Sequence, residues 1–160
     1  MSESVICCFT GHRSLDPARL SQISELLDCV LDGLIREGVT VFRTGGAMGF
    51  DTLAALKILD RKEKDPRLSL ELCLPCRDQT RGWQDLHREY YESILKRADR
   101  VRYVGEAYTQ TCMMERNRML VDGSRFCVAF CQSEVGGSAY TVRYAEKKGL
   151  RIINLARMLL

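Results

Sequence analysis

The sequence predicts one α/β domain over residues 1–160, a doubly wound Rossmann-like fold with a mostly parallel sheet. Two observations predict it. Short, nearly continuous apolar runs alternate with amphipathic segments of helical length, and no Pro-, Gly- or Ser-rich linker interrupts them. Strands separated by such helices pair in parallel through right-handed crossovers, and helices on both faces explain why the strands are apolar throughout.

The expected elements follow one another in alternation. Strands are expected over six apolar runs: residues 4–11, 39–46, 68–75, 99–105, 125–131 and 150–156. Helices are expected over the five segments between them: residues 17–37, 50–64, 83–98, 112–124 and 136–149. In the first helix, Asp16 suits the N-cap, Pro17 the first helical position and Gly38 the stop. Its apolar residues recur every three or four positions.

The composition indicates an ordinary globular protein. Apolar residues make up 46% and charged residues 28%, and 24 basic against 21 acidic residues give a net charge of +3. This balance favours a mixed, solvated surface, so nucleic acid is not an expected partner. No apolar run approaches the ~20 residues of a membrane span, and the N-terminus lacks the pattern of a signal peptide. A cytoplasmic location without membrane contact is therefore expected.

The eight cysteines do not indicate a disulfide framework, because a cytoplasmic cysteine behaves as a small buried hydrophobe. Five lie in strand-like runs: Cys7, Cys8, Cys73, Cys127 and Cys131. The CLPC segment from Cys73 to Cys76 has the spacing of a redox centre or of half a zinc site. A structural role is favoured over both, because a redox CxxC opens a helix and a zinc site needs a second ligand pair. No metal site is expected.

Polar and glycine-rich segments follow four of the expected strands. They are TGHR (10–13), TGGAMGFD (44–51), PCRDQTRGW (75–83) and GGSAYT (136–141). Ligands of open α/β sheets bind outside the carboxyl ends of the strands, so these segments are expected to meet along one edge of the sheet. A binding site is predicted at that edge.

The segment TGGAMGFD predicts an anion site at the start of a helix. Gly45 and Gly46 allow positive φ values and remove Cβ atoms that would block a ligand, and the helix beginning near Gly49 offers unpaired N–H groups. The pattern is neither GxGxxG nor GxxxxGK(S/T), so magnesium-dependent nucleoside triphosphate chemistry is not expected. Asp51 either caps the helix and supports the loop or receives a ribose hydroxyl.

The segment VGGSAYT repeats this arrangement after the fifth strand. Gly136 and Gly137 permit a close approach, and Ser138 and Thr141 place hydroxyls where the next helix starts. A plain turn with a helix cap explains one such loop. Two on the same edge favour a ligand whose diphosphate contacts both.

Five other side chains are candidates for the same edge. Arg13 is suited to bind phosphate or carboxylate, or to pair with an acidic neighbour. His12 is expected to position the ligand or the loop, with acid–base catalysis the weaker alternative because no nucleophile stands beside it. Trp83 either stacks on a ring or anchors the core. Arg116 and Asn117 either face the crevice or lie on a charged helix surface.

Together these motifs resemble the YpsA-like branch of the SLOG superfamily, which also includes DprA (Smf) and the Lonely Guy phosphoribohydrolases. The resemblance is carried, in order over nearly the whole chain, by TGHR, GGAMGFDTLAA, the LP…W segment, ERNRMLVDGS and GGSAYTVRYA. It implies a Rossmann-like fold that binds a nucleotide or a nucleotide-derived ligand of NAD or ADP-ribose type, without a required cofactor. It also implies a link to bacterial cell division or stress.

By position, the resemblance implies a set of ligand-binding residues: Thr10, Gly11, His12, Arg13, Gly45, Gly46, Gly49, Asp51, Gly136, Gly137 and Thr141. Lonely Guy enzymes carry PGGxGTxxE, whose glutamate takes part in cleaving an N-glycosidic bond. Here VGGSAYTVRYA has valine for proline and no glutamate at that spacing, and Glu146 lies too far along the helix. The additional C-terminal domain and the dominant basic face of a DprA-like protein are not expected either.

The leading hypothesis is a module that binds and senses a nucleotide-type ligand and passes its occupancy to a partner protein. Two alternatives stay open. One is a nucleotide hydrolase with an altered motif that uses His12, Asp51 or another carboxylate, so the sequence leaves open whether the chain is an enzyme. The other is a DprA-like nucleic-acid-binding scaffold. A homo-oligomer is compatible with the aromatic and methionine residues of REYYESI and TCMMERN, although core packing explains them equally well.

Overall fold

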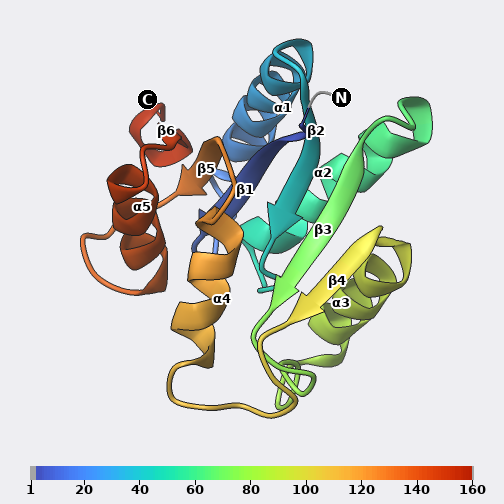
Figure 1. Cartoon of the computed structure of the whole chain (residues 1–160), viewed down its shortest axis with the longest axis vertical. Helices are drawn as coiled ribbons and strands as arrows, with labels where there is room; N and C mark the ends of the chain where they lie inside the picture. The colour runs from blue at the N-terminus through green and yellow to red at the C-terminus, as the bar shows by residue number, and fades with distance from the viewer. Residues whose placement is uncertain (1–2, 160) are drawn as a thin grey trace.

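A parallel sheet of six strands, in the order β4-β3-β2-β1-β5-β6, runs through the centre of the computed structural model, which describes residues 3–159 (Figure 1). The strands are β1 (Val5–Gly11), β2 (Val39–Thr44), β3 (Ser69–Leu74), β4 (Arg100–Tyr103), β5 (Phe126–Phe130) and β6 (Arg151–Asn154). All five strand pairs are parallel. The predicted α/β fold with a parallel sheet is confirmed.

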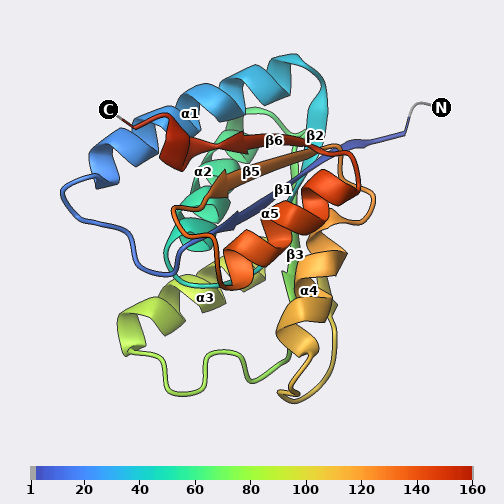
Figure 2. The ribbon, with the colours of Figure 1, turned by 90° about the vertical axis from the view of Figure 1, so that its left-hand side faces the viewer.

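Helices alternate with these strands along the chain. They are α1 (Leu20–Arg36), α2 (Phe50–Lys64), α3 (Asp85–Arg97), α4 (Cys112–Val121), α5 (Gly137–Lys147) and the 3₁₀ turn η1 (Leu155–Arg157). Figures 1 and 2 show α1, α2 and α3 on one face of the sheet and α4 and α5 on the other. The chain winds outward from β1 to β4 and then returns to β5, so the strand order reverses between β1 and β5. Ligands of doubly wound sheets bind at this kind of switch point.

The core is divided by the sheet into two unequal parts. The larger part lies under α1, α2 and α3 and is built on fully buried Phe9, Phe42 and Phe50. The smaller part lies under α4 and α5, where Cys8 and Cys127 pack with aliphatic side chains. All eight cysteines are free thiols, so those inside the sheet act as small apolar residues.

The CLPC segment ends a strand, as the sequence predicts. Cys73 is the penultimate residue of β3, and Cys76 follows it in a buried position outside any helix. Burial raises the pKa of the Cys76 thiol to about 11, with the neighbouring Asp78 acting in the same direction. A thiol with so high a pKa is protonated at neutral pH and is therefore a weak nucleophile.

Most expected elements are one to three residues longer than the observed ones at an end, and three of these boundary differences have a visible local cause. The first helix begins at Leu20, and Asp16 instead closes a separate turn by accepting a hydrogen bond from the Ala18 N–H (2.9 Å). The third helix begins at Asp85, two residues after Trp83, because residues 80–83 form their own turn with Gly82 at φ +81°. The last strand stops at Asn154, whose side chain caps the 3₁₀ turn that follows. Side-chain caps of local turns explain the first and the last of these differences.

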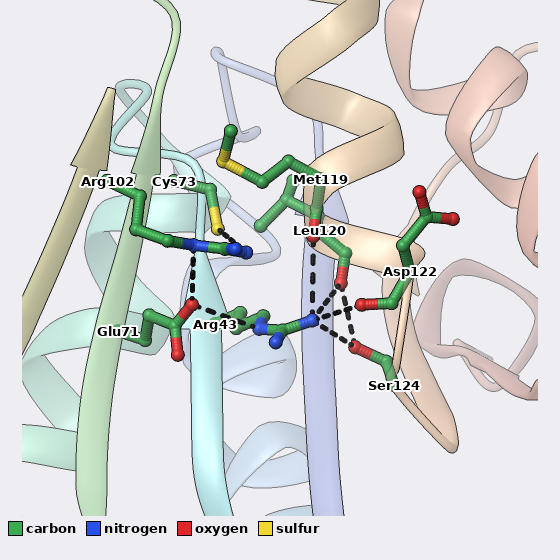
Figure 3. A network of polar contacts seen from close by, with 8 residues as sticks. All are labelled: Arg43, Glu71, Cys73, Arg102, Met119, Leu120, Asp122 and Ser124. Atoms are coloured by element: carbon green, nitrogen blue, oxygen red, sulfur yellow. Dashed lines mark hydrogen bonds and ion pairs between the residues drawn. The ribbon is translucent and has the colours of Figure 1, made fainter. Parts of the chain in front are cut away.

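A buried charge network fastens α4 to the sheet (Figure 3). Arg43 of β2 forms an ion pair with Glu71 of β3 (3.3 Å), and Glu71 also pairs with Arg102 of β4 (2.9 Å). The other end of the Arg43 guanidinium donates to backbone carbonyls where α4 ends, the shortest contact being with Asp122 (2.5 Å). A cation at a helix C-terminus satisfies carbonyls that lack a partner and complements the helix dipole. The network thus fixes the height of α4 above β2.

The helices of residues 3–159 are all too short or too polar to cross a lipid bilayer.

Candidate functional site

A hollow of about 570 Å³ opens at the carboxyl ends of β1 and β5, at the switch point of the sheet. It receives residues from the loops after β1, β2 and β5 and from α4. Ten of the predicted site residues line it: Thr10, Gly11, His12, Arg13, Asp51, Arg116, Asn117, Gly136, Gly137 and Ser138. Three of the four segments predicted to meet at this edge, those after β1, β2 and β5, contribute to the lining, whereas residues 75–83 do not. Contact of the lining residues with a ligand stays a prediction.

The glycine turn after β5 is open to this hollow. Gly136 has φ +100° and directly precedes α5, and no side chain caps the first turn of the helix. A Cβ on Gly136 would meet nothing within 4 Å, and one on Gly137 would approach only Nδ2 of Asn117, at 3.8 Å. Uncapped N–H groups at a helix start, together with the helix dipole, favour binding of an anion.

Thr141 has a structural role in the first turn of α5. It is buried, does not line the hollow, and donates its hydroxyl hydrogen bond to the carbonyl of Gly137 (2.9 Å). The sequence pattern placed this hydroxyl at the helix start correctly, but the bond to its own helix directs it away from the hollow.

The glycine turn after β2 is filled by protein atoms, contrary to the expectation that its missing side chains make room for a ligand. A Cβ on Gly45 would lie 2.6 Å from Nη1 of Arg116, and one on Gly46 would overlap Leu74. A Cβ on Gly49 would overlap the backbone of the β1–α1 loop. None of the three lines the hollow, because other parts of the chain occupy the space beside them.

The N–H donors of this turn are also used internally. Phe50 donates its N–H to the carbonyl of His12 (3.1 Å), and Ala47 donates to Oδ2 of Asp51 (3.2 Å). The start of α2 therefore supports the loop after β1 rather than offering these donors to an anion. Of the two alternatives for Asp51, loop support is the one that this hydrogen bond shows.

His12 is held by the chain itself. Its Nε2 accepts a hydrogen bond from the Gln132 N–H (2.8 Å), and its ring lies edge-on to Phe130 at 5.8 Å. This contact ties the loop after β1 to the loop after β5. The geometry matches the expected positioning role.

Arg13 stands next to His12 and is exposed at the rim of the hollow. Among residues 3–159 no carboxylate forms an ion pair with it. Its charge nevertheless acts on the carboxyl group of Asp51, so the interaction with an acidic neighbour is a longer-range one and the guanidinium has no direct ion pair within residues 3–159.

Arg116 and Asn117 face the hollow from α4, and both are buried. Arg116 donates through Nη1 to the carbonyl of Gly45 and through Nε to Oδ1 of Asn117 (2.9 Å). Burial lowers the pKa of the Arg116 guanidinium, while the charge of Asp51 opposes this shift. Oδ1 of Asn117 accepts a hydrogen bond from Arg116. The amide nitrogen of Asn117 lies beside the start of α5 and is therefore the atom of this side chain that is left for a ligand.

Asp51 is the only carboxylate among the described residues that line this hollow. Burial raises the pKa of its carboxyl group to about 6, and the charge of Arg116 and the N–H groups of Ala47 and Gly45 limit the rise. Its Oδ1 has no hydrogen-bond partner among the described residues. A carboxyl group with a pKa near neutrality inside a cleft has the properties of a candidate proton donor or acceptor.

Sequence reasoning missed several residues of the lining. They are Ala47, Met113, Leu120, Ser133 and Val135. Val135 is 77% exposed although it is apolar, and its position directly before two glycines was a signal that it stands at the mouth of the site. Met113 and Leu120 carried no such signal, because apolar residues of α4 were equally suited to the core. No group of three or more potential metal ligands converges within the part of the chain described.

Comparison with known proteins agrees with this fold and these motifs. The family model named YpsA, described as the YspA SLOG family, matches residues 7–155. The chain belongs to this family. Among proteins similar to this YspA SLOG chain is a UPF0398 protein of Bacillus cereus (strain ATCC 14579), 25% identical over 154 residues, which cover 90% of this chain and 84% of the relative. The SPbeta prophage-derived protein YoqJ of Bacillus subtilis (strain 168) is also 25% identical, over 82% of this chain and 84% of its own.

Two solved structures share the fold. The DNA processing protein A (DprA) of Streptococcus pneumoniae matches with a TM-score of 0.66 and 16% identity over 93% of this chain. DprA of Helicobacter pylori, described for its mode of binding single-stranded DNA, matches with a TM-score of 0.63 and 18% identity over 92% of this chain. The chain spans only 49% and 63% of these two structures. At such identities the likeness shows the fold alone.

Proposed function

We propose that this YspA SLOG protein binds a small nucleotide-derived ligand of NAD or ADP-ribose type, with a phosphate group of the ligand at the start of α5. The observation that carries the proposal is the open glycine turn at Gly136 and Gly137, which lines the same hollow as Arg13, an arginine without an ion pair among residues 3–159. The N–H donors and dipole of the helix start, together with the Arg13 guanidinium, are complementary to phosphate oxygens.

The volume and lining of the first hollow are suited to a small ligand. Its volume of about 570 Å³ lies within the usual range of about 300–1,000 Å³ for small-molecule sites. The amide nitrogen of Asn117 and the hydroxyl of Ser138 add two polar groups, while Met113 and Val135 provide apolar surface. Few polar groups within a partly apolar wall are typical of a site that orients a metabolite.

We extend the proposal to sensing, in which occupancy of the hollow is passed to a partner protein in the cytoplasm. The loops after β1 and β5 are joined by the contact of His12 with Gln132, so a ligand between them would bear on both. Free thiols throughout the chain, including exposed Cys29, are compatible with a reducing compartment.

The test is calorimetry with NAD, ADP-ribose, AMP and a cyclic nucleotide. Gly137→Glu places a carboxylate in the hollow at the first residue of α5, where an acidic side chain is favourable for the helix, so this variant is expected to fold. We expect at least a tenfold loss of affinity for the ligand that binds. Gly33→Glu in α1, where a Cβ meets nothing within 4 Å, makes the same chemical change away from the site and should bind normally. Silence of the wild-type protein toward all four compounds would refute the proposal.

A hydrolase is a second candidate, favoured by the raised pKa of Asp51 in the lining. A carboxyl group that titrates near neutrality could protonate a leaving base, a contribution of about 10²–10⁴-fold in rate. Release of free base or of ribose 5-phosphate from nucleoside monophosphates, lost in Asp51→Asn, would support this candidate. Binding without turnover over a long incubation would leave the binding module as the function.

Binding of single-stranded DNA is a property described for one of the DprA structures. For this chain the net charge of +3 over 160 residues supplies little general attraction to a polyanion. A gel shift with single-stranded DNA at physiological salt decides the point, because non-specific phosphate contacts weaken steeply as salt rises.

A further inference from the structure

A second hollow of about 420 Å³ adjoins the first. It lies between the loop that follows β3 and the loop that precedes α4, and Trp83, Tyr108 and Gln79 are among its lining residues. Arg13 and Met113 line both hollows, so the two meet at these side chains. A ligand held in the first hollow can therefore extend past Arg13 into the second.

Two aromatic side chains give the second hollow walls suited to a flat ring. Tyr108 is 66% exposed, which is unusual for a tyrosine that only fills space. Trp83 is half-buried and lies edge-on to Tyr91, with ring centroids 5.6 Å apart and an interplanar angle of 82°. This contact fixes the orientation of the indole beside α3. Of the two alternatives for Trp83, packing on the core is the one observed, and stacking on the ring of a ligand stays a prediction.

Gln79 supplies an independent indication of a polar ligand. Its amide oxygen and nitrogen are both buried, and neither has a hydrogen-bond partner among the described residues. The oxygen stands 3.4 Å from the position that a Cβ on Gly46 would take, so the amide lies against the first glycine turn. Leaving a buried amide unpaired is costly, and native proteins pair such groups with protein, water or ligand.

We propose that the second hollow is the base-recognition subsite of the ligand, and that the base is adenine. The base would stack on Trp83 and Tyr108, and a change of side-chain torsion would turn the Gln79 amide toward its edge. A glutamine amide matches adenine because it donates and accepts at once, as N7 and the N6 amino group require. This inference rests on the proposed function, since it assumes that the phosphate groups occupy the first hollow.

Trp83 makes the inference directly measurable, because it is the only tryptophan of the chain. We expect AMP, ADP and ADP-ribose to change its fluorescence in a saturable way, whereas pyrophosphate and ribose 5-phosphate bind by calorimetry without that change. ADP-ribose should bind at least tenfold more tightly than ribose 5-phosphate, since stacking on aromatic side chains contributes on this scale. Equal affinities of the two would overturn the inference.

Variants separate stacking from edge recognition. Tyr108→Ser, at an exposed position that tolerates substitution, should weaken the binding of ADP-ribose about tenfold. The affinity for pyrophosphate should stay unchanged. Tyr90→Ser removes another exposed tyrosine, on α3 and outside both hollows, and should change neither affinity. Gln79→Leu should abolish the preference for AMP over UMP. A preference that survives in Gln79→Leu would exclude the amide as the specificity determinant.

Failure of this inference can be told from failure of the proposed function. If pyrophosphate and ribose 5-phosphate bind but Tyr108→Ser has no effect on ADP-ribose, the first hollow stands and the base subsite is wrong. If no phosphate compound binds, the proposed function fails. The base subsite would then be supported only if adenosine, which has no phosphate, changed the fluorescence of Trp83. A larger change with oligodeoxyadenylate than with ADP-ribose, at equal base concentration, would overturn the assignment to a small molecule.

Discussion

The guanidinium of Arg116, carried by α4, donates a hydrogen bond to the carbonyl of Gly45 directly after β2. Residues 71 positions apart thus meet beneath the site, and Asp51 lies beside them, buried with its carboxyl group close to the same glycine. The contact exists only because residue 45 has no side chain, since Nη1 occupies the space that a Cβ would need. Three predictions concern this support and the neighbouring charge network.

Gly45→Ala is expected to destabilise the protein by about 1–3 kcal/mol, the usual cost of overpacking. The new Cβ would lie 2.6 Å from Nη1 of Arg116 and 3.0 Å from Oδ2 of Asp51, so the buried pair would have to move apart. Urea unfolding measures the loss. The same change at Gly33, in the open part of α1, should leave stability unchanged or raise it by about 1 kcal/mol. Similar effects at both positions would contradict the assigned role of Gly45.

The raised pKa of Asp51 predicts an unusual pH dependence of the stability of the protein. Burial raises its pKa from 3.8 to about 6 in the folded protein, so between these values the native state binds more protons than the unfolded state. Stability contributed by the neutral carboxyl group is fully present below about pH 4 and is lost as pH rises through about 6. The gap of about 2 pKa units corresponds to about 3 kcal/mol.

Asp51→Asn isolates this effect, because asparagine stays neutral at every pH. The free energy of unfolding of the variant, minus that of the wild-type protein, should rise by about 2–3 kcal/mol from about pH 4 to about pH 8. Urea unfolding at each pH measures this difference. Asp60→Asn, exposed on the same helix, serves as the control and should follow the wild type within about 0.5 kcal/mol. A constant difference between Asp51→Asn and wild type over this pH range would show that Asp51 does not titrate there.

Arg43→Met should cost about 2–4 kcal/mol, because it leaves the carbonyls that end α4 without their donor and removes one partner of buried Glu71. The double variant Arg43→Met with Glu71→Met should lose less than the sum of the two single changes. Denaturant unfolding of all four proteins gives this coupling. Breaking the exposed pair of Arg97 with Glu63 by Arg97→Met should cost less than about 1 kcal/mol. A purely additive result would mean that Arg43 and Glu71 stabilise the fold independently.

Much of the architecture could be predicted because it depends on local patterns of the sequence. Apolar runs with intervening amphipathic segments specify a parallel α/β sheet, and the rule that ligands bind at the carboxyl edge follows from that topology. The boundaries were less predictable. Asp16 has the chemistry of an N-cap, yet it caps a turn placed before the helix, and nothing local distinguishes the two cases.

The two glycine turns show where local patterns stop being informative. Both have the composition of a phosphate loop, and sequence reasoning gave them the same role. In the folded chain the turn at Gly136 is open, whereas the space beside Gly45 and Gly46 is filled by Arg116 and Leu74. A glycine in such a turn indicates that the space of a Cβ is required by another group. Only long-range packing decides whether that group is a ligand or another part of the protein.

The sequence by itself determined the order of strands and helices, the edge of the sheet where polar residues gather, and most of the side chains that line the site. Tertiary structure alone decided which helix start stays open, which arginine is buried beneath the loop and which has no ion pair within the described part of the chain. It also placed Trp83 and Tyr108 beside the first hollow. The physical reason is that periodicity and turn chemistry act over a few residues, whereas burial and pairing of charges depend on segments that meet only when the chain folds.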